Sequence, residues 1–296
     1  MEKIVMGKSV PETIVSVQNI SCGYRSGFRM EGVSFDLQKG TFAAILGPNG
    51  TGKSTLFKAL SGDLPLSGGE VLFEGKSLVA YTQKELSQRL AVVSQFTEEA
   101  AVTAREYVAM GRLPYRRPFA FFDTEEDREI VRRYMELAGV WDLRDRMMPE
   151  LSGGEQQLVS IASALAQEPD LILLDEPTSH LDLTHTIRFL DLLRTLNRRT
   201  GLTVLLILHD LNLAGEYCDY LLLTTRGRLA YHGRPEEVLT RERLREVYGT
   251  ELYAGTNPLT GKPLVLPVPS EFEVRSSKFG EEGKQGSCVP ITGNLK

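Results

Sequence analysis

Two kinds of hydrophobic pattern recur along this chain of 296 residues. Apolar and polar residues alternate from Ile14 to Ile20 and from Met30 to Leu37, which predicts two half-buried antiparallel strands. The runs Thr41–Leu46, Leu171–Leu174 and Thr203–Leu208 are apolar on both faces, as expected of strands inside a helix-covered sheet. The pattern therefore predicts an α/β fold with an antiparallel portion near its start.

Helices are expected between these strands, where hydrophobic residues recur every three to four positions instead of every second position. The expected helices are Lys53–Leu60, Gly154–Gln167 and His185–Arg198. Shorter strands are expected at Glu70–Phe73, Tyr220–Thr224 and Arg228–Tyr231.

The middle of the chain is helical in character. From Thr103 to Pro149 there is little strand signal, and Glu125–Ala138 has the period of an amphipathic helix. The apolar residues expected on its buried face are Ile130, Val131, Tyr134, Leu137 and Ala138. We expect an N-terminal extension at 1–12, one domain at 13–250 with a helical subdomain inserted at about 97–158, and a disordered tail at 270–296.

Composition limits the functional classes. Hydrophobic residues make up 42% and charged residues 25%, as in ordinary globular proteins. A formal charge of −5 gives no general reason to bind nucleic acid. The three scattered cysteines suit reduced thiols in the cytosol, and no apolar run reaches the ~20 residues that span a bilayer. The N-terminus has no signal-peptide pattern, so we expect any role at a membrane to be exerted from the cytoplasm through a partner.

One glycine-rich segment lies between a buried strand and a helix and has the spacing of a phosphate-binding loop. The segment is Gly47, Pro48, Asn49, Gly50, Thr51, Gly52, Lys53 and Ser54, followed by Thr55. Glycines let backbone N–H groups face a phosphate, Lys53 can reach the β- and γ-phosphates, and the Ser54 hydroxyl can ligate Mg²⁺. The plainer alternative is a glycine-rich turn that only caps a helix.

Two carboxylates follow the second buried strand. Asp175 and Glu176 stand where Leu171–Leu174 ends, at the edge where open α/β sheets bind ligands. Asp175 is placed to hold Mg²⁺, and Glu176 to polarise the attacking water as a catalytic base. His209 ends another core strand, so its side chain is expected at the same edge, within reach of a γ-phosphate. The other three histidines are interpreted as surface or structural residues.

A second segment has the form of an anion-binding helix start. Ser152 suits the N-cap position, and Gly153 and Gly154 would expose backbone N–H groups, with Glu155 following. Taken alone, this pattern is better explained by an ordinary helix cap with a glycine pair.

Leu151–Gln157 resembles the signature segment of the ABC ATPases, and the other motifs of that family follow in order over about residues 14–250. By this resemblance, Tyr24 stacks on adenine, and Gln95 is the glutamine that meets Mg²⁺ and signals to a membrane partner. The segment Ser179–Asp182 resembles the D-loop, and His209 the switch histidine.

The resemblance implies an ABC-type P-loop ATPase core with an antiparallel β subdomain and an inserted helical subdomain. It implies ATP and Mg²⁺ as cofactors, and Glu176, His209 and Gln95 as catalytic residues. It also implies a head-to-tail dimer, expected to be a homodimer, in which Ser152–Glu155 and Asp182 complete the partner's site. An integral membrane permease and, indirectly, an extracytoplasmic substrate-binding protein would complete the assembly at the cytoplasmic face of the membrane.

Three segments resemble those of importers for iron chelates, haem and cobalamin. They are Gly111–Tyr115, His209–Ala214 and Asn257–Pro263, the last resembling a short C-terminal hairpin that we expect at 251–269. The alternatives are a soluble ABC ATPase acting on ribosomes or DNA, the ATPase of an exporter, and a non-catalytic cassette. A single cassette and the acidic balance argue against the first, and the importer-like segment His209–Ala214 argues against the second. The intact Lys53, Asp175, Glu176 and His209 argue against the third.

The basic and aromatic run 116–122 has two interpretations. Its three phenylalanines either belong to the core or line a groove that receives a helix of the permease.

Overall fold

The computed structural model describes residues 12–24, 27–94, 101–116, 124–179 and 181–269. Its helices are α1 (Lys53–Ser61), α2 (Gln83–Ser87), α3 (Ala104–Met110), α4 (Glu125–Leu137), α5 (Gly153–Ala166), α6 (Leu183–Thr200), α7 (Leu211–Tyr217), α8 (Pro235–Val238) and α9 (Arg241–Tyr248). Its strands are β1 (Thr13–Gly23), β2 (Arg29–Gln38), β3 (Phe42–Leu46), β4 (Leu66–Phe73), β5 (Lys76–Ser77), β6 (Leu90–Val93), β7 (Leu171–Leu174), β8 (Thr203–Ile207), β9 (Tyr220–Thr225), β10 (Arg228–Gly233), β11 (Leu252–Thr256) and β12 (Pro263–Pro267).

A six-stranded sheet in the order β10-β9-β3-β8-β7-β6 forms the centre of the fold. Its strands pair in parallel except for β10, which is antiparallel to β9. Every residue of β3, β7 and β8 is buried, as their continuous apolar sequences predict. The sheet therefore carries the ends of β3, β7 and β8 to one edge.

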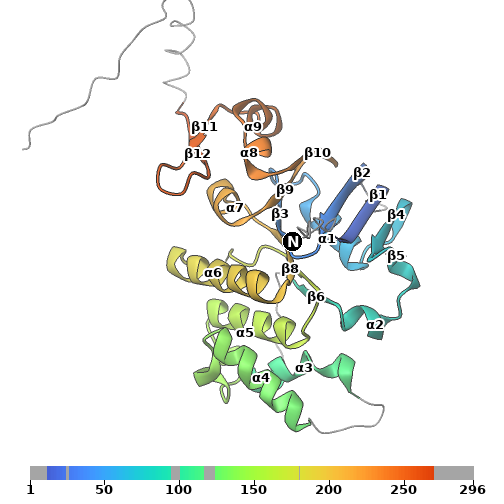
Figure 1. Ribbon diagram of the computed structural model, residues 1–296, viewed down its shortest axis with the longest axis vertical. Coiled ribbons are helices and arrows are strands. Elements are labelled where there is room, and N and C mark those ends of the chain that lie inside the picture. Colours follow the sequence, from blue (N-terminus) through green and yellow to red (C-terminus); the bar gives the residue numbers. More distant parts are fainter. Residues whose placement is uncertain (1–11, 25–26, 95–100, 117–123, 180, 270–296) are drawn as a thin grey trace, which may run out of the picture.

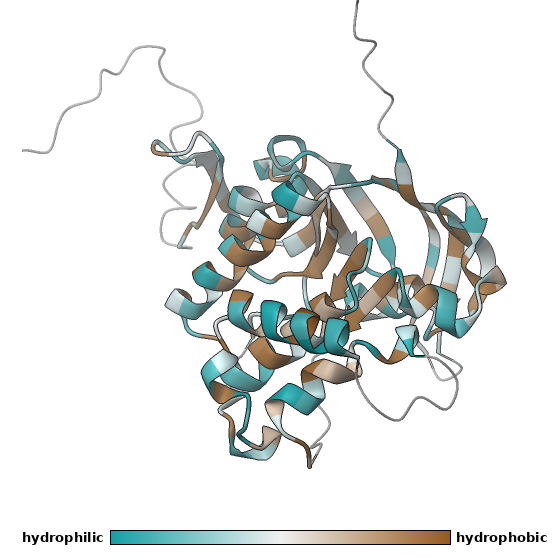
Figure 2. Cartoon of the chain, turned by 60° about the horizontal axis from the view of Figure 1, so that its bottom comes forward, coloured by the Kyte–Doolittle hydropathy of each residue, from teal (hydrophilic) through white to brown (hydrophobic). Residues whose placement is uncertain are grey.

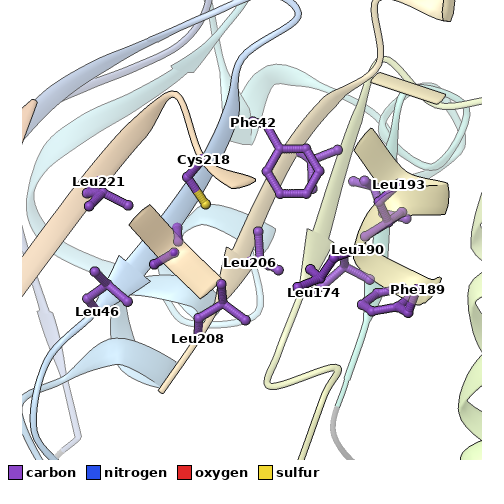
Figure 3. Packing of buried hydrophobic residues seen from close by; sticks show 14 of the residues in the cluster. Phe42, Leu46, Leu174, Phe189, Leu190, Leu193, Leu206, Leu208, Cys218 and Leu221 are labelled. Carbon is purple, nitrogen blue, oxygen red and sulfur yellow. The ribbon is translucent and has the colours of Figure 1, made fainter. Parts of the chain in front are cut away.

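Helices such as α6 cover one face of this sheet, and α1 together with an antiparallel sheet covers the other. Phe42, Leu174, Leu190 and Leu206 belong to the hydrophobic cluster between the central strands and α6 (Figure 3). The second sheet has the order β2-β1-β4-β5, and its inward residues, such as Val33 and Phe35, form a second cluster. The expected antiparallel portion is thus confirmed. Figure 2 shows the hydrophobic strands between helices with hydrophilic outer surfaces.

The helices α3, α4 and α5 lie together at the end of the molecule away from β1 and β2 (Figure 1). They share a hydrophobic cluster that includes Val108, Ile130, Met135 and Val159. The expectation for Leu137 was wrong, because this last residue of α4 is 43% exposed and lines a surface groove. Met135 is fully buried in its place, because α4 is covered by both α3 and α5.

The C-terminal hairpin is confirmed as β11 and β12, which pair from Leu252↔Pro267 to Thr256↔Pro263. Strands β5 and β6 and helices α2, α7, α8 and α9 were not expected from the sequence. Within the described ranges, no helix is both long and apolar enough to cross a membrane. The N-terminal extension before residue 12, most of the run 116–122 and the tail 270–296 lie outside the described residues.

Candidate nucleotide site

The glycine-rich loop connects β3 to α1 in a conformation that requires glycine at two positions. Gly47 has a φ of 144°, and a Cβ there would lie 2.4 Å from the carbonyl oxygen of Thr224. Gly52 has a φ of 108°, and a Cβ there would meet Met30 and Phe28 at under 3 Å. Residues with a side chain rarely adopt such φ values. The loop is therefore built for close backbone approach, as a phosphate cradle requires.

Lys53 lies folded against the start of this loop. Its Nζ atom donates to the carbonyl oxygens of Gly47 and Pro48, each at 3.0 Å. Burial lowers the pKa of Lys53, although the charges of Glu176 and Asp175 act in the opposite direction. A buried ammonium held by neutral carbonyls is ready to exchange them for phosphate oxygens.

A threonine from a distant strand braces the loop. The Thr224 hydroxyl, fully buried on β9, donates to the carbonyl oxygen of Leu46 at 3.0 Å and lies 2.9 Å from the Thr51 hydroxyl. Thr51 in turn donates to the carbonyl oxygen of Pro48 at 2.9 Å. Sequence reasoning missed Thr224, because a lone threonine in an apolar strand carries no local signal of this contact.

Phe28 and Glu176 line the cavity over this loop. The loop residues beside them are Asn49, Gly50, Gly52, Lys53, Ser54 and Thr55. Sequence reasoning missed Phe28, which reaches the loop from the turn before β2. Tyr24 is 41% exposed and is not among the lining residues, and its backbone N–H donates to the Phe28 carbonyl at 3.1 Å. Its contact with adenine therefore stays a prediction.

Asp175 has the properties of a cation ligand. It is buried where β7 ends, and its Oδ1 atom has no hydrogen-bond partner. Burial, and then the charge of Glu176, raises the pKa of its carboxyl group. A buried carboxylate oxygen without a donor fits a metal ion that would neutralise it.

A magnesium ion at this point would need few protein ligands. In the part of the chain that the structure describes, no cluster of three or more His, Cys, Asp and Glu forms a metal site. Mg²⁺ is usually held by one or two protein oxygens together with phosphate oxygens and water. Asp175 and Ser54 therefore fit a Mg²⁺ that arrives with a nucleotide.

Glu176 and His209 meet beside the loop, as expected from their places after β7 and β8. The Nε2 atom of His209 lies 2.7 Å from Oε1 of Glu176. Glu176 has a φ of 49°, a left-handed conformation that is uncommon for a residue with a side chain. The sheet thus brings Lys53, Asp175, Glu176 and His209 to one place.

The second group of expected residues forms a separate cavity. Its lining includes Leu158, Leu181 and His185, together with Ser152, Gly153, Gly154, Glu155 and Asp182. Ser152 caps α5 in a reciprocal capping box with Glu155, and Asp182 caps α6 by accepting from the backbone N–H of His185 at 2.8 Å. Two helix N-termini therefore converge here, which favours an anion. None of these residues lines the loop cavity.

Gln95 and His180 lie outside the described residues. The expected roles of Gln95 at Mg²⁺ and in signalling stay predictions.

Comparison with known proteins agrees with this geometry. Residues 30–179 match the family model for ABC transporters. The chain belongs to the ABC transporter family, and it is an ATP-binding and ATP-hydrolysing subunit. It is 39% identical over 262 residues to the uncharacterised ABC transporter ATP-binding protein YvrA of Bacillus subtilis, covering 88% of this chain and 59% of that protein. It is 37% identical to the ferric enterobactin transport ATP-binding protein FepC of Escherichia coli, covering 85% of this chain and 93% of FepC.

Other relatives of this ABC subunit carry names for a probable siderophore transport system and for iron(3+)-hydroxamate and cobalamin import. Among solved structures, it resembles a metal-chelate type ABC transporter in an inward-facing conformation, with a TM-score of 0.76 and 29% identity over 88% of this chain and 99% of that one. It also resembles the dimeric cassette MJ0796, with a TM-score of 0.68 and 27% identity over 75% and 98% of the two chains.

Proposed function

We propose that this subunit powers the import of an iron chelate, haem or cobalamin through a separate membrane permease. The observation that carries the ATPase part is the meeting of Lys53, Asp175, Glu176 and His209 at one edge of the sheet. The cargo class is supported by the transport and import proteins that the chain resembles over more than nine-tenths of their length. The relatives whose names specify import favour import over export and over action on ribosomes or DNA.

The chemistry proposed is attack of water on the γ-phosphate of ATP. Ser54 and Asp175 would hold Mg²⁺, which supplies positive charge to the phosphate oxygens. Glu176 orients the attacking water and accepts its proton, while Lys53 neutralises the charge that develops on the phosphate oxygens. The new bond forms between the water oxygen and the γ-phosphorus, and the bond to the bridging oxygen of ADP breaks. His209 contacts both the Glu176 carboxylate and the γ-phosphate and so fixes their positions relative to each other.

The separate cavity at Ser152–Glu155 supports a dimer. Because one chain holds two anion-binding cavities that share no lining residue, each would complete the site on a second copy. MJ0796, which has the same fold, is dimeric. We propose a head-to-tail homodimer in which ATP lies between the loop of one copy and the signature segment of the other.

The helical region of the chain is proposed as the part that contacts the membrane protein. The helical region at about 97–158, with its own hydrophobic cluster, is proposed to receive the permease at the cytoplasmic face. An extracytoplasmic substrate-binding protein would act on the same permease without touching this subunit. The phenylalanine run proposed for that groove lies almost wholly outside the described residues.

A mixing experiment tests the composite site. Lys53→Ala removes the cation of one half of the site, the glycine-rich loop. Gly153→Asp places a carboxylate in the other half of the site, at the signature segment, where an added Cβ meets no atom within 4 Å. Each variant alone should hydrolyse ATP at background rate, and an equimolar mixture should recover part of the activity. A mixture as inactive as its components would contradict the composite site.

A further inference from the structure

The helix that follows His209 is bound to the C-terminal hairpin. The side-chain amide of Asn212, on α7, accepts from the backbone N–H of Val265 at 2.7 Å and donates to the Val265 carbonyl at 3.1 Å. Asn212 thus satisfies both main-chain groups of one residue of β12. Figure 1 shows the hairpin of β11 and β12 beside α7.

Further contacts hold the same two elements together. The Thr260 hydroxyl, in the turn of the hairpin, donates to the Glu216 carboxylate at 2.8 Å. Gly215 lies so close to the hairpin that an added Cβ would be 3.0 Å from the Pro263 carbonyl oxygen. The Val265 side chain is buried in the cluster that also contains Ala214. The hairpin is therefore seated on α7 by polar and apolar contacts together.

The distance along the chain from this contact to the nucleotide site is short. Asp210 caps α7, since its Oδ1 accepts from the backbone N–H groups of Asn212 at 2.8 Å and Leu213 at 3.0 Å. On the other side of His209, the backbone N–H of Leu208 donates to the Ile45 carbonyl at 3.2 Å. His209 thus stands between a strand fixed in the central sheet and a helix fixed by its cap and the hairpin.

We infer that Asn212 is a positioning residue, through which the C-terminal hairpin sets the place of His209 against Glu176. This inference rests on the catalytic role proposed above for His209. It also gives one physical reason for two segments that the sequence showed separately, His209–Ala214 and Asn257–Pro263. Asn212 lies in the first of these segments, and its partner Val265 follows the second by two residues on β12, 53 residues after Asn212 in the sequence.

Three variants in the full chain test the inference. Asn212→Ala removes both hydrogen bonds, and Asn212→Asp keeps an acceptor for the Val265 N–H but loses the donor. Leu266→Ser is the matched control, because this neighbour of Val265 on β12 has an exposed side chain. Each purified dimer is measured for kcat and KM for ATP, for thermal unfolding and for the imidazole NMR signals of labelled histidine.

We expect Asn212→Ala to lower kcat roughly tenfold with KM nearly unchanged, because a small displacement of a catalytic group lowers the rate strongly. The ring signals of His209 should shift while those of His185 and His232 stay in place. Asn212→Asp should fall between wild type and Asn212→Ala, and Leu266→Ser should match wild type.

The inference is overturned if Asn212→Ala lowers the melting temperature but leaves kcat and the His209 signals unchanged. The contact would then only hold the hairpin in place. Failure of the proposed role of His209 gives a different result: His209→Ala would keep full turnover, whatever the NMR signals of Asn212→Ala show.

Discussion

The Nε2 atom of His209 lies 2.7 Å from Oε1 of Glu176, at the point where two neighbouring parallel strands end. Glu176 adopts a φ of 49° at this place, a conformation that costs about 1–3 kcal/mol in a residue with a side chain. The surrounding sheet and the contact with His209 hold the carboxylate in spite of that cost. Such strain is expected where a side chain must point toward a reacting group rather than toward its own core.

Glu176→Gln should bind ATP and hydrolyse it at least about a hundredfold more slowly, because the amide cannot accept a proton from water. We also expect ATP to accumulate in a closed dimer, which gel filtration with and without ATP would detect. Glu129→Gln, an exposed change on α4, is the control. Normal ATP turnover in Glu176→Gln would show that Glu176 is not the catalytic base.

Lys53→Ala should weaken ATP binding, because the phosphate oxygens lose the main cation of the loop. Nucleotide affinity is measured by titration with a fluorescent ATP analogue. Lys76→Ala, at a position outside the loop cavity, should bind as wild type does. Unchanged affinity in Lys53→Ala would refute the role given to this residue.

Thr224→Val should lower the free energy of unfolding by about 1–3 kcal/mol, because the carbonyl of Leu46 and the hydroxyl of Thr51 lose a buried partner. Thr224→Ser keeps the hydroxyl and should recover most of the loss. Urea unfolding of the nucleotide-free protein measures both. Equal stability of the valine and serine variants would show that the hydroxyl does not brace the loop.

Arg112→Met should destabilise the helical region by about 3–5 kcal/mol, because it leaves the buried Asp127 carboxylate without its cation at 2.9 Å. Arg128→Met breaks an ion pair with Glu125 that is exposed on both sides, and should cost less than about 1 kcal/mol. Unfolding curves of the two variants give the comparison. Equal losses in the free energy of unfolding would mean that burial does not determine how much the Arg112–Asp127 pair contributes to stability.

The ion pair of Arg112 and Asp127 also predicts how stability changes with pH. Burial would raise the pKa of Asp127, but hydrogen bonds from Arg112 and Thr124 outweigh it and hold that pKa below its ordinary value. A carboxyl whose pKa is lowered by folding contributes stability above its unfolded pKa of about 3.9, and loses it as the pH falls through the folded value. The stability difference between wild type and Asp127→Asn should therefore shrink on acidification below about pH 4. A difference that does not change with pH would contradict this origin.

Local sequence was sufficient wherever one short segment carries both the fold and the chemistry. The apolar strands β3, β7 and β8 predicted the central sheet, and the residues that follow them predicted that Glu176 and His209 lie at the same edge of it. Contacts between distant segments were not predictable in this way. Phe28, Thr224 and the pair Asn212–Val265 act across turns or between strands far apart in the sequence, where residue type gives no sign of the partner. Leu137 shows the same limit, since periodicity gives the face of a helix but not where its covering neighbours end.

The most direct test of the function is uptake of labelled ferric siderophore, haem and cobalamin by cells whose only copy of this subunit carries Lys53→Ala. Cells with the wild-type copy and with Lys76→Ala serve as controls. We expect the uptake of one of these cargoes to be lost in Lys53→Ala cells, while the other two enter at the control rate. Normal entry of all three would contradict the import function proposed here, and the ATPase assignment alone would stand.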